Sequence, residues 1–232
     1  MAIIDWPETL RPRERLIRLG PQSLSDAELL AVFLRIGIAG KSAVDLGREL
    51  VEHFGSLSRM FAADLSAFTS LPGLGPAKFA QLQAVLELAR RSLHEQMHSA
   101  TLFKSPQTVQ DYLRLLIGDK PHECFVILFL DVQCRLIDSE QMFRGTLDHA
   151  SVYPREVVKS ALQRNAASII LAHNHPSGQL QPSQSDLAIT TRLQQALELC
   201  DIRLLDHFII TRTGTYSFAE HGQLPAPSAA PG

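Results

Sequence analysis

The sequence predicts a mixed α/β domain, in which helices flank a sheet, preceded by an all-helical N-terminal domain. Across residues 1–96, apolar residues recur at the three- and four-residue spacing of amphipathic helices. Across residues 106–223, short apolar segments typical of strands alternate with helical segments, and the stretch has a usual domain size. Residues 97–105 lose the helical spacing and are expected to form a linker. The Pro/Ala-rich residues 224–232 are expected to be a disordered tail.

Three main helices are expected in the N-terminal domain. The segment SDAELLAVFLR starts with Ser25 and has Glu28 three residues later, the capping-box pattern of a helix start. SAVDLGRELVEHFG keeps the helical spacing and ends at Gly55, a residue typical of helix C-termini. GPAKFAQLQAVLELARRSLHEQ, over residues 75–96, is the third and longest helix.

The second domain is expected to begin with the helix PQTVQDYLRLLIG, which has Pro106 in its first turn. CFVILFLD is apolar on both faces, so we expect a central strand that is covered on both sides. SIILAH is a short buried strand that ends at His173. The same criteria predict a strand over 134–143, helices over 154–166 and 182–200, and strands over 202–211 and 215–220.

Composition and charge describe an ordinary soluble protein. Of the 232 residues, 45% are hydrophobic and 20% charged, and a formal net charge of −2 gives no overall attraction to nucleic acid or anionic membrane. No apolar run is long enough to span a bilayer, and the N-terminus lacks the pattern of a signal peptide. Cys124, Cys134 and Cys200 show no CxxC spacing. We therefore interpret them as reduced thiols of a cytoplasmic protein and expect no cysteine-based zinc site.

SLPGLGPAK places Gly73 and Gly75 just before the long helix and Lys78 in its first turn. The pattern resembles a helix-hairpin-helix motif, with DLSAFTS as the first helix, which grips the phosphate backbone without reading bases. A tight turn whose glycines serve packing alone is the alternative. Residues 1–100 carry eleven Lys and Arg against eleven Asp and Glu, without the basic excess usual in a DNA binder. Non-specific DNA contact through this turn stays a hypothesis.

Two histidines, His173 and His175, lie two residues apart at the end of the strand SIILAH. Strand side chains alternate, so both imidazoles point to one face and can bind one ion. Asp186, in the first turn of the next helix, is the expected third ligand. This donor set suits zinc and leaves the fourth position for water, as in catalytic sites. Alternatively Ser183 and Asp186 form only a helix cap, and Asp186 can also serve both roles.

Two other metal-site interpretations do not fit. The string His-Asn-His is not the arrangement of HNH nucleases, whose residues are spread over a hairpin and a helix. An HxH pair also opens the metal site of amidohydrolase barrels, but there it lies on the first of eight strands. Only 57 residues follow His175, too few for such a barrel.

The full pattern from His173 to Asp186, H-x-H-P-x6-S-x2-D, resembles the motif of JAMM (MPN-type) metalloproteases. That motif also includes an upstream glutamate at the edge of a strand. Glu123, directly before CFVILFLD, fits the JAMM order of helix, glutamate and strand best. Of the other candidates, Glu140 lies within the second strand and Glu156 in the first turn of a helix.

From about residue 7 to residue 222 the chain resembles the RadC family (UPF0758). The resemblance rests on the segments RPRERL, LSDAELLAVFLRIG, LPGLGPAK, GTL at 145–147, YPREVVKSAL, AHNHPSGQLQPSQSD and LLDHFIIT. It implies a helix-hairpin-helix-like N-terminal part joined to a JAMM-type metal domain of cytidine-deaminase-like fold. It also implies one zinc ion per chain on His173, His175 and Asp186. The implied reaction is hydrolysis of a peptide or isopeptide bond in a protein or peptide substrate.

The implied reaction gives each neighbouring residue an expected role. Glu123 takes the proton of the attacking water and returns it to the leaving amine. Ser183 donates a hydrogen bond to the oxyanion. His207, in LLDHFII, is interpreted as a core histidine with a satisfied partner, or alternatively as a residue behind the ligands. Asn174 points to the other face of the strand and is expected to order the loop.

Two further functions stay open. One is a DNA-associated repair or recombination factor, as the historical label of the family suggests, in which the metal domain is structural or acts on a DNA-bound protein. The other is a catalytically silent JAMM scaffold, against which the intact Glu, His, His, Ser and Asp argue. A nuclease is not favoured, because nucleases commonly use clusters of carboxylates and only Asp186 accompanies the histidines. The sequence leaves the substrate and the oligomeric state open.

Overall fold

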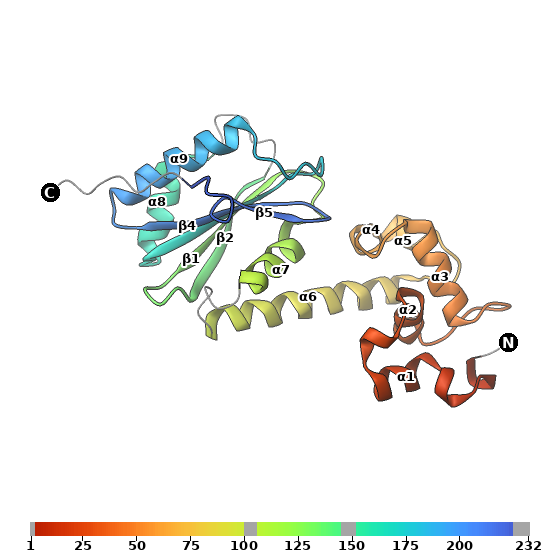
Figure 1. The fold of residues 1–232 in the computed structure, drawn as a ribbon. Coiled ribbons are helices and arrows are strands. Elements are labelled where there is room, and N and C mark those ends of the chain that lie inside the picture. The colour runs from red at the N-terminus through yellow and green to blue at the C-terminus, as the bar shows by residue number, and fades with distance from the viewer. Residues whose placement is uncertain (1–2, 100–105, 145–151, 225–232) are drawn as a thin grey trace. The chain divides into compact units, whose positions relative to one another are not determined.

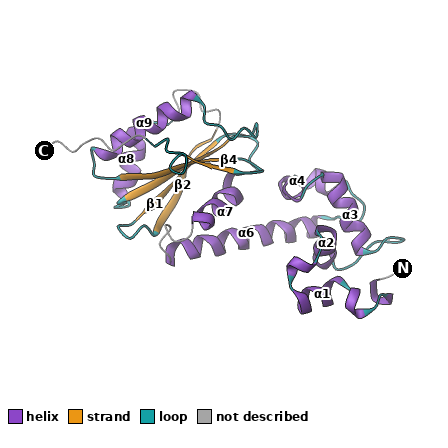
Figure 2. Cartoon of the chain, in the orientation of Figure 1, coloured by secondary structure: helices purple, strands orange, loops and turns teal. Residues whose placement is uncertain are grey.

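A computed structural model describes residues 3–99, 106–144 and 152–224 of the chain. The chain divides into two compact units, Met1–Glu87 and Leu88–Gly232, and the division falls within helix α6 (Pro76–Ser99). Figures 1 and 2 show helices alone in the first unit and a sheet with helices in the second. Across the three described ranges, no helix is long and apolar enough to cross a membrane.

The N-terminal unit is built from short helices, two of which start or end at residues that the sequence signals predict. Ser25 and Glu28 form a capping box, and Gly55 ends a helix in the left-handed conformation, so both predictions are confirmed. The elements before α6 are η1 (Ile3–Asp5), η2 (Glu8–Leu10), α1 (Pro12–Leu19), η3 (Pro21–Ser23), α2 (Asp26–Leu34), α3 (Ala43–Phe54), α4 (Leu57–Ala62) and α5 (Leu65–Thr69).

Two details of the helical prediction are wrong. Residues 1–96 are not helical throughout, because Ile38 and Lys41 pair as an isolated bridge in the turn between α2 and α3. The third helix ends at Ser99 and so includes the first residues of the predicted linker. It continues because Leu93 and Met97, four residues apart, pack into the core of the C-terminal unit. Residues 100–105 of the linker and 225–232 of the tail lie outside the described residues.

The C-terminal unit contains a five-stranded mixed sheet, which confirms the predicted fold class. The strand order is β2-β1-β3-β4-β5, with β3 and β4 parallel and every other neighbouring pair antiparallel. Its elements are α7 (Pro106–Ile117), β1 (Cys124–Leu130), β2 (Leu136–Arg144), α8 (Pro154–Gln163), β3 (Ser168–Asn174), α9 (Gln184–Glu198), β4 (Arg203–Ile210) and β5 (Thr215–Ser217).

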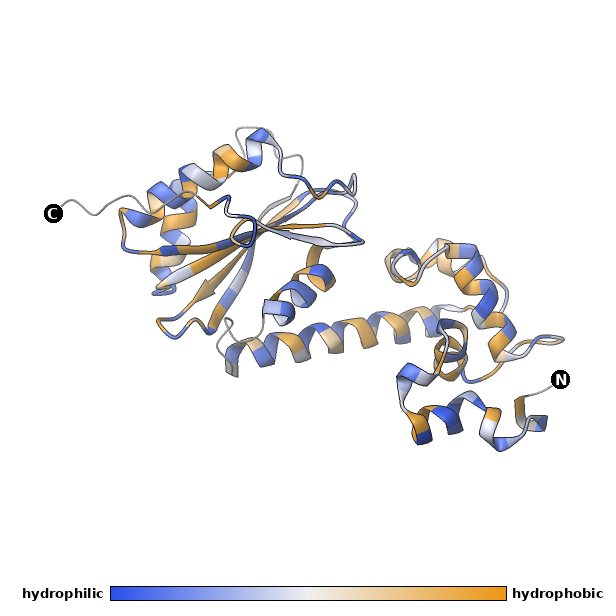
Figure 3. Cartoon of the chain, viewed as in Figure 1, coloured by the Kyte–Doolittle hydropathy of each residue, from blue (hydrophilic) through white to orange (hydrophobic). Residues whose placement is uncertain are grey.

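Helices cover both faces of this sheet. Val126 and Leu128 of β1 share a core cluster with residues of α7, whereas Phe125, Ile127 and Phe129 share one with residues of α8 and α9. All seven residues of β1 are buried, as expected for a central strand between two layers. Figure 3 shows the hydrophobic residues concentrated on the strands. The odd-numbered residues of β1 therefore face α9, which carries Asp186.

Candidate metal centre

His173 is the last-but-one residue of β3, and its side chain is fully buried. It pairs across the ladder with Phe125, whose side chain faces the α8 and α9 layer. His175 lies just past the strand end, where its N–H donates to the carbonyl of Ile210 at 2.9 Å. Strand alternation therefore places both imidazoles on the α9 side of the sheet, as the sequence predicts.

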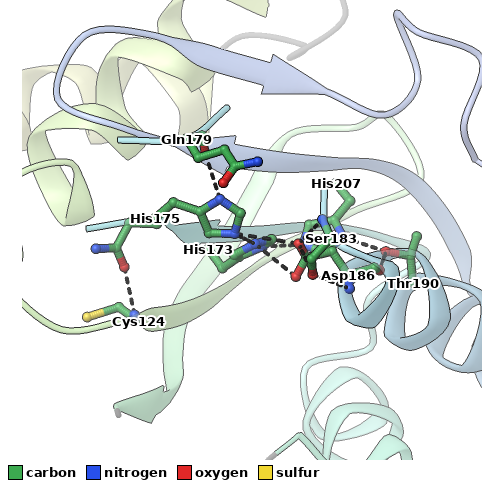
Figure 4. Close-up of polar contacts among 9 residues, drawn as sticks. Cys124, His173, His175, Gln179, Ser183, Asp186, Thr190 and His207 are labelled. Carbon is green, nitrogen blue, oxygen red and sulfur yellow. Dashed lines mark hydrogen bonds and ion pairs between the residues drawn. The ribbon is translucent and has the colours of Figure 1, made fainter. Parts of the chain in front are cut away.

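The side chains of His173, His175 and Asp186 converge in the structure and are called the metal cluster below (Figure 4). The two Nε2 atoms lie 2.9 Å apart. Asp186 Oδ1 lies 3.3 Å from His173 Nε2, and Oδ2 lies 3.5 Å from His175 Nε2. Within the described part of the chain, this is the group of ligand-type side chains close enough together to hold one metal ion.

The two oxygens of Asp186 have different partners. Oδ2 accepts hydrogen bonds from the N–H and the hydroxyl of Ser183, both at 2.7 Å, and Ser183 Oγ accepts from the Asp186 N–H at 3.2 Å. The predicted capping box is therefore present. Among the hydrogen bonds and ion pairs of the described residues, Oδ1 of Asp186 contacts His173 and no other residue. It is therefore the oxygen that is open to a metal. Cap and ligand roles are compatible in one side chain.

The far nitrogens of both imidazoles are already bonded. His175 Nδ1 lies 2.7 Å from the carbonyl oxygen of Gln179, which can only accept, so this nitrogen carries a proton. His173 Nδ1 lies 2.8 Å from Nε2 of His207. The Nε2 atoms of both imidazoles point at each other and at the carboxylate of Asp186. A cation shared by these three groups suits this arrangement, as in a metal site whose ligands are held from behind.

The charges in the metal cluster support this conclusion. Burial disfavours the charged forms of Asp186 and His175. Hydrogen bonds with His173, His175 and Ser183 nevertheless lower the pKa of Asp186 far below its ordinary range. Asp186, the Gln179 carbonyl and Glu123 together raise the pKa of His175 despite its burial. The same negative groups that favour a charged His175 would favour a metal cation at this position.

Glu123 directly precedes β1, whose Phe125 pairs with His173 across the ladder. The charge of Glu123 contributes to the raised pKa of His175. The two other glutamates are engaged elsewhere. Glu140 accepts from Ser160 Oγ at 2.5 Å and pairs with Arg164 at 3.0 Å, and Glu156 pairs with its neighbour Arg155.

Asn174 faces the opposite side of β3 and holds the loop before β1. Its Oδ1 accepts from the N–H of Cys124 at 2.7 Å, and its Nδ2 donates to the carbonyls of Lys120 and His122 at 3.2 and 3.1 Å. The expected loop-ordering role is therefore confirmed. These bonds fix both neighbours of Glu123, a consequence that was not foreseen from the sequence.

His207 on β4 has a specific polar partner behind the ligands. It is fully buried, and its Nδ1 lies 2.7 Å from Thr190 Oγ1, while its Nε2 contacts His173. Of the two interpretations of His207, the structure favours a residue behind the ligands. Thr190 was missed, because a threonine within a helix gives no signal until the position of α9 on the sheet is known.

The predicted hairpin lies in the N-terminal unit, between α5 and α6. Gly73 has φ +83°, and a Cβ at this position would lie 2.4 Å from Cγ2 of Ile38, so close packing explains this glycine. A Cβ at Gly75 would meet nothing within 4 Å. Lys78 Nζ donates to the Gly73 carbonyl at 2.7 Å. The ammonium group carries three protons, so this bond leaves two of them for a phosphate.

Comparisons with known proteins cover both units. Residues 103–223 match the RadC-like JAB domain family, and residues 3–80 match the UPF0758 N-terminal family. A UPF0758 protein of Herminiimonas arsenicoxydans is 63% identical over 97% of this chain and 100% of its own length. UPF0758 proteins of Janthinobacterium sp. (strain Marseille) and Nitrosomonas eutropha are 62% and 61% identical, over 97% and 96% of this chain and 100% and 99% of their own lengths. These names state no activity.

Proposed function

The chain belongs to the UPF0758 family with a RadC-like JAB domain, and from this premise we propose that it is a zinc-dependent hydrolase of peptide or isopeptide bonds. One observation carries the proposal. Two imidazole Nε2 atoms and one carboxylate oxygen converge, while the other nitrogen of each imidazole is bonded to a neighbour. JAB domains are metal-dependent, and this donor set fits that requirement.

The residues that would hold the metal are His173, His175 and Asp186, through Nε2, Nε2 and Oδ1. Three such ligands suit zinc and leave one position for a water or a substrate oxygen. A zinc ion there would lower the pKa of a water toward about 7 and polarise the scissile carbonyl. The cluster contains a single carboxylate, whereas sites that process phosphodiesters commonly use several carboxylates with harder metals. An acyl substrate is therefore favoured over a nucleic acid.

Glu123 is assigned as the general base. It directly precedes β1, and its charge acts on His175 without its being a member of the cluster. In this proposal its carboxylate takes the proton from the attacking water and passes it to the leaving amine. The bonds of Asn174 hold the backbone on both sides of Glu123.

Ser183 is assigned as the donor to the oxyanion, although its hydroxyl has another partner in the structure. The hydroxyl donates to Asp186 Oδ2 and accepts from the Asp186 N–H. A hydroxyl carries one proton, so Ser183 stabilises an oxyanion only after that proton leaves Asp186 Oδ2. The N–H of Ser183 still bonds Oδ2 during this change and keeps Asp186 in place.

The proposal is tested by metal analysis of the purified chain beside a His173→Ala/His175→Ala variant. The expected result is one zinc per chain in the wild type and none in the variant. His53→Ala/His98→Ala removes two histidines outside the metal cluster and is the matched control, which should keep its zinc. Equal zinc in all three proteins contradicts the site.

Bond specificity needs a second experiment. A peptide-library digest compares the wild type with Glu123→Gln, which keeps the ligands and removes the base. Loss of cleavage with zinc retained supports the proposed chemistry. Cleavage that Glu123→Gln leaves unchanged contradicts it.

A further inference from the structure

We propose that His207 and Thr190 form a positioning relay that keeps the proton of His173 on Nδ1 and so presents its Nε2 lone pair to the metal. The inference rests on the proposed metal site. It concerns residues of β4 and α9 that are not themselves ligands. The contacts of the relay are drawn in Figure 4.

The direction of the relay is fixed at its far end by a backbone carbonyl. Thr190 Oγ1 lies 2.5 Å from the carbonyl oxygen of Asp186, which can only accept a hydrogen bond. The single hydroxyl proton of Thr190 is therefore used. Toward His207 Nδ1, at 2.7 Å, the hydroxyl can only accept, so His207 carries its proton on Nδ1.

This proton determines the state of His173. A neutral His207 protonated on Nδ1 has a lone pair on Nε2, which lies 2.8 Å from His173 Nδ1. His173 Nδ1 must then be the donor. The neutral imidazole of His173 has no second proton, so its Nε2 is free to act as a ligand.

The surroundings of His207 exclude the alternatives. The residue is fully buried, so no solvent contact competes for its ring nitrogens, and a charged imidazole is disfavoured there. Phe218 stacks on its ring with centroids 4.7 Å apart, and Phe125 meets the ring edge-on at 5.8 Å. These apolar contacts hold the ring plane while the two hydrogen bonds set its protons.

The relay also links two ligands through three elements. It starts at the backbone of Asp186 on α9, passes through His207 on β4 and ends at His173 on β3. His175 lies outside the relay, since the Gln179 carbonyl fixes its proton separately. Of the two histidine ligands, the proposal therefore predicts that loss of the relay changes the protonated nitrogen of His173 and leaves that of His175 unchanged.

Zinc affinity of the full-length chain, measured by competition with a chelator, is the first test. Thr190→Val removes the hydroxyl at nearly constant shape, and His207→Phe removes both ring nitrogens but keeps an aromatic ring. Each should weaken zinc binding by about 10- to 100-fold, as is typical for partners behind metal ligands. Thr190→Ser restores the hydroxyl and should bind zinc nearly as the wild type does. Thr191→Val is the matched control, because it removes the next hydroxyl along α9, which donates to the Leu187 carbonyl and lies outside the relay, and it too should keep its affinity.

The second test detects the protons directly by long-range 1H–15N spectra of the imidazoles in the metal-free chain. In the wild type, His173 and His207 should both be protonated on Nδ1. In Thr190→Val, His207 Nδ1 loses its acceptor, so its proton should move to Nε2 and His173 should become protonated on Nε2. A relay that served only packing would leave these signals unchanged.

The outcomes separate this inference from the proposed function. A wild-type chain that binds no zinc contradicts the proposed metal site. The 1H–15N spectra of the metal-free chain still show whether the relay places the proton of His173 on Nδ1. Zinc bound equally tightly by wild type, Thr190→Val and His207→Phe overturns the relay and leaves the proposed function standing. A wild-type His173 protonated on Nε2 also overturns it.

Discussion

The metal cluster in the C-terminal unit and the glycine turn at Gly73–Lys78 in the N-terminal unit use their polar groups differently. In the cluster, each histidine bonds a neighbouring residue through Nδ1 and directs Nε2 toward the place where a metal would bind. In the turn, Lys78 folds back on the Gly73 carbonyl, and Gly73 is required by the approach of Ile38. Among the described residues, the cluster is where three ligand-type atoms from separate side chains converge, whereas the turn offers a single cation that already has an acceptor.

The comparison predicts its largest effect at Asp186. Asp186→Ala removes the ligand oxygen Oδ1 and the cap acceptor Oδ2, so zinc content should fall from one per chain to none. The lost cap should also lower the free energy of unfolding by about 1 kcal/mol. Ser183→Ala weakens the cap by a similar amount and leaves Oδ1 in place, so it should retain zinc. Zinc analysis and denaturant unfolding of both variants separate ligand from cap, and zinc loss in Ser183→Ala contradicts the separate roles of the two oxygens.

The second effect is the pH dependence of zinc binding. The pKa of His175 is raised above its ordinary value, so a proton competes with zinc on this residue. Below the folded-state pKa, zinc affinity should fall about tenfold for each pH unit, because one proton must leave. Calorimetric titration from about pH 5 to about pH 8, the range in which histidine titrates, measures this slope. A pH-independent affinity contradicts a proton on His175.

The raised pKa of His175 also makes the stability of the metal-free fold depend on pH, and this stability falls as the pH rises, whereas zinc affinity increases. A raised folded-state pKa means that the His175–Asp186 interaction stabilises fully below the ordinary histidine pKa of about 6.5. That stability is lost as the pH rises through the folded-state pKa of His175. The difference between wild type and His175→Ala, measured by urea unfolding with a chelator present, should therefore shrink on alkalinisation. A difference that grows with pH contradicts the assignment.

A smaller effect is expected at Asn174, on the face of β3 that points away from the ligands. Asn174→Ala leaves the Cys124 N–H and two carbonyls without this partner and should cost about 1–3 kcal/mol of unfolding free energy. Zinc content should stay at one per chain, while peptide turnover falls because Glu123 loses its support. Gln179→Ala is the control, since His175 bonds only the backbone of Gln179. Unchanged turnover in Asn174→Ala contradicts the positioning of Glu123.

The smallest effect is expected in the glycine turn. Lys78→Ala removes one exposed hydrogen bond to the Gly73 carbonyl and should change the unfolding free energy by less than about 0.5 kcal/mol. If this turn contacts phosphate, the same variant also lowers the salt dependence of DNA binding by about one unit of slope. Because residues 1–100 carry no excess of basic over acidic side chains, we expect no such change. A lower slope with the full-length chain assigns the turn to DNA and breaks the contrast with the metal cluster.

Local sequence signals predict the positions that depend on nearby residues. The capping boxes at Ser25 and Ser183 involve residues three positions apart, so the sequence alone reveals them. Strand alternation likewise places His173 and His175 on one face. Helix α6 runs past its predicted end because Met97 gains its packing from the core of the C-terminal unit, which no local pattern reports.

Contacts between distant segments could not be predicted in the same way. His207 reaches His173 only because β4 lies beside β3, and Thr190 reaches His207 only because α9 packs on that pair. Glu123 directly precedes β1, so its distance from His175 depends on how β1 pairs with β3. The order of the JAMM motif selects Glu123 in the sequence, whereas only the folded chain shows that its charge acts on His175.

The most direct test of the central claim is X-ray absorption spectroscopy of the zinc-loaded chain. Coordination by His173, His175 and Asp186 predicts nitrogen and oxygen neighbours at about 2.0–2.1 Å and the multiple scattering of two imidazole rings. The imidazole signal should disappear in His173→Ala/His175→Ala. Sulfur scattering at about 2.3 Å, or a spectrum that the double substitution leaves unchanged, would contradict the claim that these three residues form the metal centre.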